Sequence, residues 1–237
     1  MVYHVTMKLE QIVNWLDRTL DVKSFSDVSN NGIQIARSGD DVTKVAFGVD
    51  ASVRTVLDAA EARAQLLVVH HGISWGGGIH RLTGGVYAVV KAAMDANIAL
   101  YAVHLPLDAN HAYGNNYELA RFLGLKNLKP AFVYHGETIG VVGMLPNGKK
   151  VGVCSGGAGC HAQDAKELGC DLFITGEADW GETIAAENIG MRMICAGHYQ
   201  TETFGVKAVA RAMARRLKIE TVFLPRLDSG AGAESHR

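Results

Sequence analysis

Two adjacent histidines offer the most specific chemistry in this sequence. His70 and His71 directly follow the apolar residues 66–69 and precede Gly72. Imidazole nitrogen and carboxylate oxygen together suit divalent ions such as Zn, Fe, Mn or Ni. Because consecutive side chains of a strand face opposite ways, both rings can serve one site only where the strand ends and Gly72 turns the chain. The alternative is that one histidine packs in the core and the other lies on the surface.

A carboxylate follows a second apolar segment, residues 98–103. Asp108 has two oxygens and could bridge two cations, and Pro106 restricts the backbone φ angle just before it. An aspartate in a loop also commonly caps a turn or a helix, which is the other interpretation. His104, four residues earlier, could be a further ligand or could orient one. We favour the orienting role.

A third pair follows the apolar residues 191–196. His198 and Glu202 are four residues apart, and both would point back to the strand end if a helix begins near Thr201. Alternatively, Thr201 caps that helix and Glu202 only interacts favourably with the helix dipole. The three segments together supply three imidazoles and two carboxylates, which predicts a centre of two divalent ions. Mixed nitrogen and oxygen ligands without thiolates indicate a catalytic rather than a structural metal.

The elements that must position these residues alternate between apolar strands and amphipathic helices. This order predicts an α/β fold with mostly parallel sheets flanked by helices, and open sheets of this kind bind ligands at the carboxyl ends of their strands. We expect two interleaved halves, residues 1–130 and 131–227, followed by a disordered tail, residues 228–237. The predicted strands are residues 45–49, 66–69, 98–103, 138–145, 151–154, 172–174, 191–196 and 221–224. The predicted helices are residues 8–20, 53–63, 85–96, 116–123, 160–168, 180–188 and 202–217.

Composition excludes several classes of protein. The chain has 237 residues with 23 Lys+Arg and 24 Asp+Glu, so no overall positive charge attracts nucleic acid, and a small molecule is the expected partner. No apolar run approaches the roughly 20 residues that span a membrane, and we expect a cytoplasmic protein. The four cysteines show no CxxC spacing and are expected to be free thiols.

Several strings resemble those of one protein family. Residues 69–72, 104–108, 174–177 and 196–202 are similar to motifs of the NIF3 family, also called the DUF34 or GTP cyclohydrolase 1 type 2 family, and residues 29–32 match its N-terminal Asn/Gly segment. The resemblance runs from about residue 8 to 224 and is to the compact form without an inserted middle domain. It implies two metal ions per subunit and a toroidal hexamer built from dimers. The ligands that it implies are His70, His71, Asp108, His198 and Glu202.

The same resemblance implies GTP cyclohydrolase activity, in which water attacks C8 of the purine and opens its imidazole ring. His104 or Glu177 would then move protons, although Glu177 could equally be a surface carboxylate. The alternatives are a metal-dependent phosphoesterase acting on nucleotides and a non-enzymatic metal-binding or regulatory assembly protein. The glycine-rich residues 156–159 could bind a phosphate through their N–H groups, but a tight structural turn is the interpretation we favour.

Overall fold

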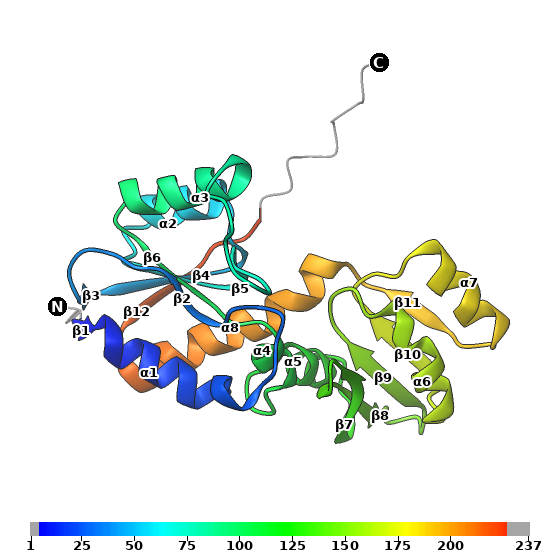
Figure 1. Ribbon diagram of the computed structural model, residues 1–237. Helices are drawn as coiled ribbons and strands as arrows, with labels where there is room; N and C mark the ends of the chain where they lie inside the picture. Colours follow the sequence, from blue (N-terminus) through cyan, green and yellow to red (C-terminus); the bar gives the residue numbers. More distant parts are fainter. Residues whose placement is uncertain (1–4, 227–237) are drawn as a thin grey trace.

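Two five-stranded sheets form the framework of the computed structural model, which describes residues 5–226 (Figure 1). The predicted tail, residues 228–237, lies outside the described residues. In the first sheet the neighbouring strands run parallel, except that the last is antiparallel to its neighbour. Their order is β12 (Glu220–Phe223), β4 (Lys44–Asp50), β5 (Leu66–His71), β6 (Ala99–Ala102) and β2 (Gly32–Ile35).

Helices cover both faces of the first sheet (Figure 1). One face carries α2 (Val53–Glu61) and α3 (Gly84–Asp95), and the other carries α1 (Leu9–Leu20) and α8 (His198–Leu217). On α1 the residues at helical spacing, Ile12, Leu16 and Leu20, are buried, because this face packs against the sheet. Ser52 caps α2 by accepting a hydrogen bond from the Thr55 N–H.

The second sheet is mixed. Its order is β11 (Met193–Cys195), β10 (Leu172–Thr175), β9 (Lys150–Cys154), β8 (Glu137–Met144) and β7 (Lys126–Tyr134). The first three strands are parallel, whereas β8 and β7 are antiparallel to their neighbours. Short turns join β7 to β8 and β8 to β9, and so short a connection permits only antiparallel pairing. The α/β class is therefore confirmed, with a lower share of parallel pairs than we expected.

Three helices pack on the second sheet. Side chains of α6 (Ala162–Glu167) and α7 (Trp180–Asn188) join one apolar cluster, and side chains of α5 (Asn115–Phe122) join another on the opposite face. The remaining described elements are short: β1 (Met7–Lys8), β3 (Asp41–Val42), α4 (Leu105–Ala109) and the 3₁₀ turns η1 (Val22–Ser24) and η2 (Gly159–His161). The sequence did not predict β2, β7 or α4.

The two halves share their elements across the predicted boundary. Strand β7 spans residues 130 and 131, and β12 pairs with β4 although it comes last in the described chain. Helix α8 starts just after the edge strand of the second sheet and packs in the core of the first (Figure 1). The division into residues 1–130 and 131–227 stays a prediction, and the structure joins the two parts through α8.

Candidate metal centre

Both adjacent histidines belong to β5, which continues through His71 instead of ending at residue 69 as we predicted. His70 is fully buried and His71 is partly buried, and their ring centroids lie 4.6 Å apart. They reach the same carboxylate: His70 Nε2 lies 3.5 Å from Glu202 Oε1, and His71 Nε2 lies 3.4 Å from Glu202 Oε2. Gly72 follows them where Gln34 and Ala102 leave no room for a Cβ atom. The structure thus brings both rings to one site.

Glu202 reaches these rings from α8. The helix begins at His198, earlier than the residue 202 we expected, after Gly197 with a φ of 95°. A left-handed φ of this kind favours glycine. His198 and Glu202 are therefore one helical turn apart, and His198 Nε2 lies 3.2 Å from Glu202 Oε1. Glu202 is buried among three imidazoles, so its contacts extend beyond a favourable interaction with the helix dipole.

The short helix α4 carries the remaining carboxylate. Asp108 Oδ2 lies 3.6 Å from His70 Nε2, and Asp108 Oδ1 accepts hydrogen bonds from Asn115 Nδ2 at 2.8 Å and from Ser155 Oγ at 3.2 Å. One oxygen is thus fixed by the protein and the other faces the histidines. His104 occupies the N-cap position of α4, and its ring centroid is 5.1 Å from that of His70.

The four imidazoles share one orientation. Each Nδ1 lies within hydrogen-bond distance of an oxygen, and the other ring nitrogen is left for the centre. The Nδ1 partners are the main-chain oxygen of Val103 for His70 at 3.0 Å, Asp50 for His71 at 2.9 Å, Asp27 for His104 at 3.0 Å and Glu177 for His198 at 2.9 Å. In the neutral rings such acceptors place the proton on Nδ1 and leave the lone pair on Nε2. Histidines that bind metals are commonly oriented in this way.

Two overlapping sets of ligand atoms lie within 4.8 Å of one another among the described residues. The first set is His70, His71 and His104, and the second is His71, His198 and Glu202. His104 therefore lies where it could be a ligand, and the orienting role that we favoured for it stays a prediction. Two buried atoms in these sets, His70 Nε2 and Glu202 Oε2, have no hydrogen-bond partner within the described part of the chain. Leaving such atoms unpaired costs about 1–3 kcal/mol each, and a divalent cation between them would satisfy both.

Electrostatics in the metal-free protein favour positive charge at this point. Burial lowers the pKa of His70, but the carboxylates of Asp108 and Glu202 outweigh it and hold the pKa above its ordinary value. Burial acts likewise on His71, but the Asp50 and Glu202 carboxylates beside its two nitrogens raise its pKa to about 10. The hydrogen bond to Glu202 raises the pKa of His198 to about 9 against the effect of burial. Burial disfavours the Glu202 carboxylate, yet the imidazoles hold its pKa well below the usual range.

The orienting carboxylates include two that the sequence reasoning missed. Asp50 pairs with His71 in the register of β4 and β5, so strand pairing itself brings these side chains together. Asp27 holds His104 Nδ1 with one oxygen and the Leu105 N–H with the other, and this fixes the start of α4. Asp50 directly follows the predicted strand 45–49. A carboxylate at the end of the strand that precedes the paired histidines in the chain is a signal that could have identified it.

Glu177 lies beside the candidate ligand His198, and one of its oxygens is already engaged by that ring. Its Oε1 is the partner of His198 Nδ1, and 62% of its side chain is exposed. The role of Glu177 in proton transfer stays a prediction. Its observed contact is to orient a candidate ligand.

The glycine-rich turn, residues 156–159, packs against Glu202. The Gly156 N–H donates to Thr201 Oγ1 and the Ala158 N–H donates to Thr175 Oγ1, so these groups are used within the protein. Gly156 has a φ of 69°, and a Cβ there would lie 2.5 Å from Glu202 Oε1. The first glycine thus makes room for the central carboxylate, and the structural role that we favoured for the turn stays a prediction.

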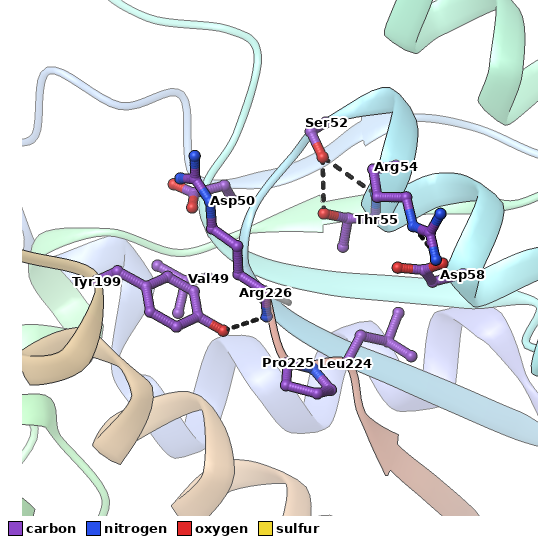
Figure 2. Close-up of a pocket in the computed structure, with 10 residues that line it drawn as sticks. All are labelled: Val49, Asp50, Ser52, Arg54, Thr55, Asp58, Tyr199, Leu224, Pro225 and Arg226. Carbon is purple, nitrogen blue, oxygen red and sulfur yellow. Dashed lines mark hydrogen bonds and ion pairs between the residues drawn. The ribbon is translucent and has the colours of Figure 1, made fainter. Parts of the chain in front are cut away.

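Two cavities adjoin these residues. The candidate metal centre opens into one of about 210 Å³, which we call the metal cavity; its lining includes His71, Asp108, His198 and Glu202. Asp50 also lines a larger cavity of about 520 Å³, which Figure 2 shows with Arg54 paired to Asp58 and with the Arg226 N–H donating to the Tyr199 hydroxyl. No histidine or cysteine lines this larger cavity among the described residues, so the ligand chemistry is concentrated in the smaller one.

Two further expectations can be compared with the described residues. The four cysteines are free, as predicted; Cys154 and Cys170 are buried, and Cys160 and Cys195 are exposed. Among residues 5–226, none of the helices combines the length and the apolar character needed to span a membrane.

Comparison with known proteins agrees with the resemblance noted from the motifs. The profile of the family described as Duf34/NIF3 (NGG1p interacting factor 3) matches residues 7–150 and 147–228. A Pyrococcus horikoshii protein named GTP cyclohydrolase 1 type 2 homolog is 36% identical, with 92% of this chain and 98% of that protein covered. One with the same name from Deinococcus radiodurans is 37% identical over 91% of this chain and 92% of its own length.

Solved structures show the same fold. The protein TTHA1606 from Thermus thermophilus is 32% identical and superimposes with a TM-score of 0.78, covering 94% of this chain and 100% of that one. Reduced HcgD from Methanocaldococcus jannaschii has a TM-score of 0.82 at 24% identity, over 94% of this chain and 99% of that one. The second likeness bears on the fold alone.

Proposed function

The chain belongs to the DUF34/NIF3 family, and on that premise we propose that it is a dinuclear metal-dependent hydrolase of the GTP cyclohydrolase 1 type 2 kind. The names of the relatives from Pyrococcus horikoshii and Deinococcus radiodurans support the reaction class. The observation that carries the proposal is the pair of buried, unpartnered ligand atoms, His70 Nε2 and Glu202 Oε2, at the meeting point of four oriented imidazoles.

Two divalent ions, of Zn, Fe, Mn or Ni, fit the donor set. His70, His104 and Asp108 would hold one ion, His198 would hold the other, and His71 and Glu202 lie between the two groups. Bound there, such ions lower the pKa of a water molecule and stabilise developing negative charge. Nitrogen and carboxylate ligands without thiolate are the set expected for ions that keep a position open to substrate.

The protein residues fix the geometry in which water meets the substrate. Asp50, Asp27 and Glu177 orient three of the imidazoles, while Asn115 and Ser155 hold one oxygen of Asp108. Such positioning lowers the barrier because the reacting groups need little further ordering. For GTP, the attacked atom would be C8 of the purine, and the product would be the opened imidazole ring.

The size of the cavity limits how a nucleotide could bind. About 210 Å³ is less than the roughly 300–1,000 Å³ usual for a site that encloses a drug-sized ligand. The cavity therefore admits the reacting part of a nucleotide and leaves the remainder outside. Because a phosphate ester would fit the same space, the metal-dependent phosphoesterase is the alternative that the test must separate.

Elemental analysis of the purified protein, combined with a screen of GTP, other nucleotides and phosphate esters, tests the proposal. We expect about two ions per chain and ring opening of GTP that is lost in His70→Ala. His111→Ala is the matched control, because His111 stacks on Tyr117 and belongs to neither ligand set. Hydrolysis of phosphate esters with GTP unchanged would replace the cyclohydrolase by a phosphoesterase. Firmly retained metal without turnover would favour a non-enzymatic metal-binding protein.

Assembly and location complete the proposal. We propose a homo-oligomer, specifically the toroidal hexamer that the family resemblance implies, working in the cytoplasm on a small molecule. Light scattering on the eluting protein tests the hexamer, and a mass near that of one or two chains would reject it. Fractionation of cells tests the location.

A further inference from the structure

A fifth histidine faces the metal cavity from the second sheet. His161 is the last residue of η2 and the N-cap residue of α6, and it lines the cavity together with His71, His198 and Glu202. Only 9% of its side chain is exposed. Because buried polar atoms normally have hydrogen-bond partners, each of the two ring nitrogens should have a partner or contact the cavity.

One nitrogen of this ring is fixed by a carboxylate. His161 Nδ1 lies 2.7 Å from Asp164 Oδ2, one turn further along the chain, which places the proton of the neutral ring on Nδ1. The ring also lies against Phe132, with the centroids 5.7 Å apart, so its orientation is restricted by packing as well. The carboxylate–imidazole pair repeats the arrangement seen at His71, His104 and His198.

The other nitrogen opens onto the cavity. Among the described residues Nε2 has no hydrogen-bond partner, yet it is absent from the buried atoms that lack one, so it must be accessible. His161 lines the metal cavity, so this cavity is the space beside its ring. The ring belongs to neither set of converging ligand atoms. An oriented and accessible nitrogen therefore lies at the cavity without belonging to the candidate ligands.

We propose that His161 is a catalytic residue of this cavity and exchanges a proton with the reacting groups through Nε2. The proposal rests on the hydrolase function proposed above. The other candidates for this role already have contacts, since His104 lies within a ligand set and Glu177 holds His198. A base that is oriented by a third group and has one free nitrogen is the arrangement that hydrolytic sites use repeatedly.

For a purine substrate, the O–H bond of the attacking water breaks and its electron pair stays on the oxygen, whose lone pair forms the bond to C8. The π electron pair of the C8=N7 bond moves to N7, and the proton goes to His161 Nε2. Asp164 stabilises the imidazolium through its hydrogen bond to Nδ1–H. The electron pair on N7 then re-forms the C8=N7 bond as the C8–N9 bond breaks with its pair on N9. The imidazolium gives its proton to N9, which leaves His161 neutral and C8 as HO–CH=N7, a tautomer of the formamide.

The test compares His161→Gln with the unchanged protein and with His111→Gln. Gln can form a hydrogen bond but cannot carry the proton, so we expect kcat for GTP to fall about 10²–10⁴-fold while KM changes only a few-fold. Elemental analysis should show the same metal content in all three proteins. Added imidazole should restore part of the activity of His161→Ala, which a purely structural role would not allow.

The outcomes separate this proposal from the function on which it rests. If the unchanged protein turns over none of the nucleotides and esters, the hydrolase function fails and the role of His161 fails with it. If that protein is active and His161→Gln keeps its kcat, only the role of His161 is rejected. Loss of metal from His161→Gln would also reject it, because His161 would then be part of the metal centre. Should His161→Gln fail to fold, Asp164→Asn replaces it, because that change removes the carboxylate that stabilises the imidazolium. We expect kcat to fall in this variant, and an unchanged kcat rejects the proposal.

Discussion

The two sides of the metal cavity differ in what they contribute. The side built on the first sheet carries every candidate ligand, from β5, from α4 and from the start of α8. The side built on the second sheet contributes Ser155, Gly156, Glu177 and His161, which contact ligands or line the cavity but belong to neither ligand set. The first side would thus hold the ions and also orients three of the imidazoles, whereas the second side orients His198 and Asp108 and forms the opposite wall of the cavity.

Two groups differ strongly in burial across this division. Glu202 on the first side is almost entirely enclosed, whereas 62% of the Glu177 side chain on the second side is exposed. Water can replace an exposed orienting group but cannot reach an enclosed ligand, so equal chemical changes should have unequal effects on the two sides.

The largest effect is expected for Glu202→Gln on the first side. The change removes the charge that lies among three imidazoles, and metal affinity should fall by more than about 100-fold, the upper limit for loss of an outer partner. Competition with a chelator measures this. Glu187→Gln, on the exposed surface of α7, is the matched control and should bind as the unchanged protein does. Undiminished affinity in Glu202→Gln would show that this carboxylate is not a ligand.

The next comparison sets one orienting carboxylate against another. Asp50→Ala should weaken metal binding about 10–100-fold because His71 loses the partner of its Nδ1. Glu177→Ala should weaken it about tenfold or less, because water can take over at the exposed His198. Titration with the same chelator measures both variants. A larger effect from Glu177→Ala would contradict the division between the two sides.

Metal affinity should rise with pH. In the metal-free protein the pKa values of His71 and His198 are raised to about 10 and about 9 from the ordinary value near 6.5, so both rings are protonated near neutral pH. Binding must displace these protons, and affinity should increase about tenfold per pH unit for each proton displaced, until pH passes those values. Chelator competition at about pH 7 and about pH 8 checks the sign. Affinity that stays constant or falls over this interval would contradict the pairing with Glu202.

The smallest effect should come from the second side, away from the ligands. Asp179 caps α7, accepting from the Glu182 N–H at 2.7 Å while Glu182 Oε2 accepts from the Asp179 N–H. Asp179→Ala should lower the free energy of unfolding by about 1 kcal/mol and leave metal content unchanged. Urea unfolding and elemental analysis measure the two quantities. Loss of metal from Asp179→Ala would show that α7 affects metal binding, which would contradict the division between the two sides.

The sequence was informative where residue types are unusual. A pair of histidines after an apolar run, and a histidine and a glutamate four residues apart, are rare enough to be noticed without a structure. The structure brings all five predicted ligands together. The helix predicted at residues 180–188 coincides with α7, because a capping box marks its start.

The orienting groups could not be predicted so directly. Asp50 and Asp27 are ordinary aspartates until β4 is known to pair with β5 and until α4 is known to begin at His104. Helix α4 has five residues, and its start is held by Asp27 from a distant segment, so local preference gives no signal for it. Strand β7 buries only Ala131 and Phe132 and lacks the alternation by which strands are recognised.

The return of the chain to its first sheet bears on how this protein is made. Strand β12 supplies residues 220–223 to an edge beside β4, and Glu202 arrives on the helix just before it. A ribosome releases these segments long after β4, so the nascent chain exposes the edge of β4 and an incomplete set of ligands until α8 and β12 have emerged. Such late, long-range pairing slows folding and leaves an unfinished strand edge open to other chains. Metal loading is therefore expected to follow the emergence of α8, and truncation before α8 should yield a chain that aggregates without acquiring ions.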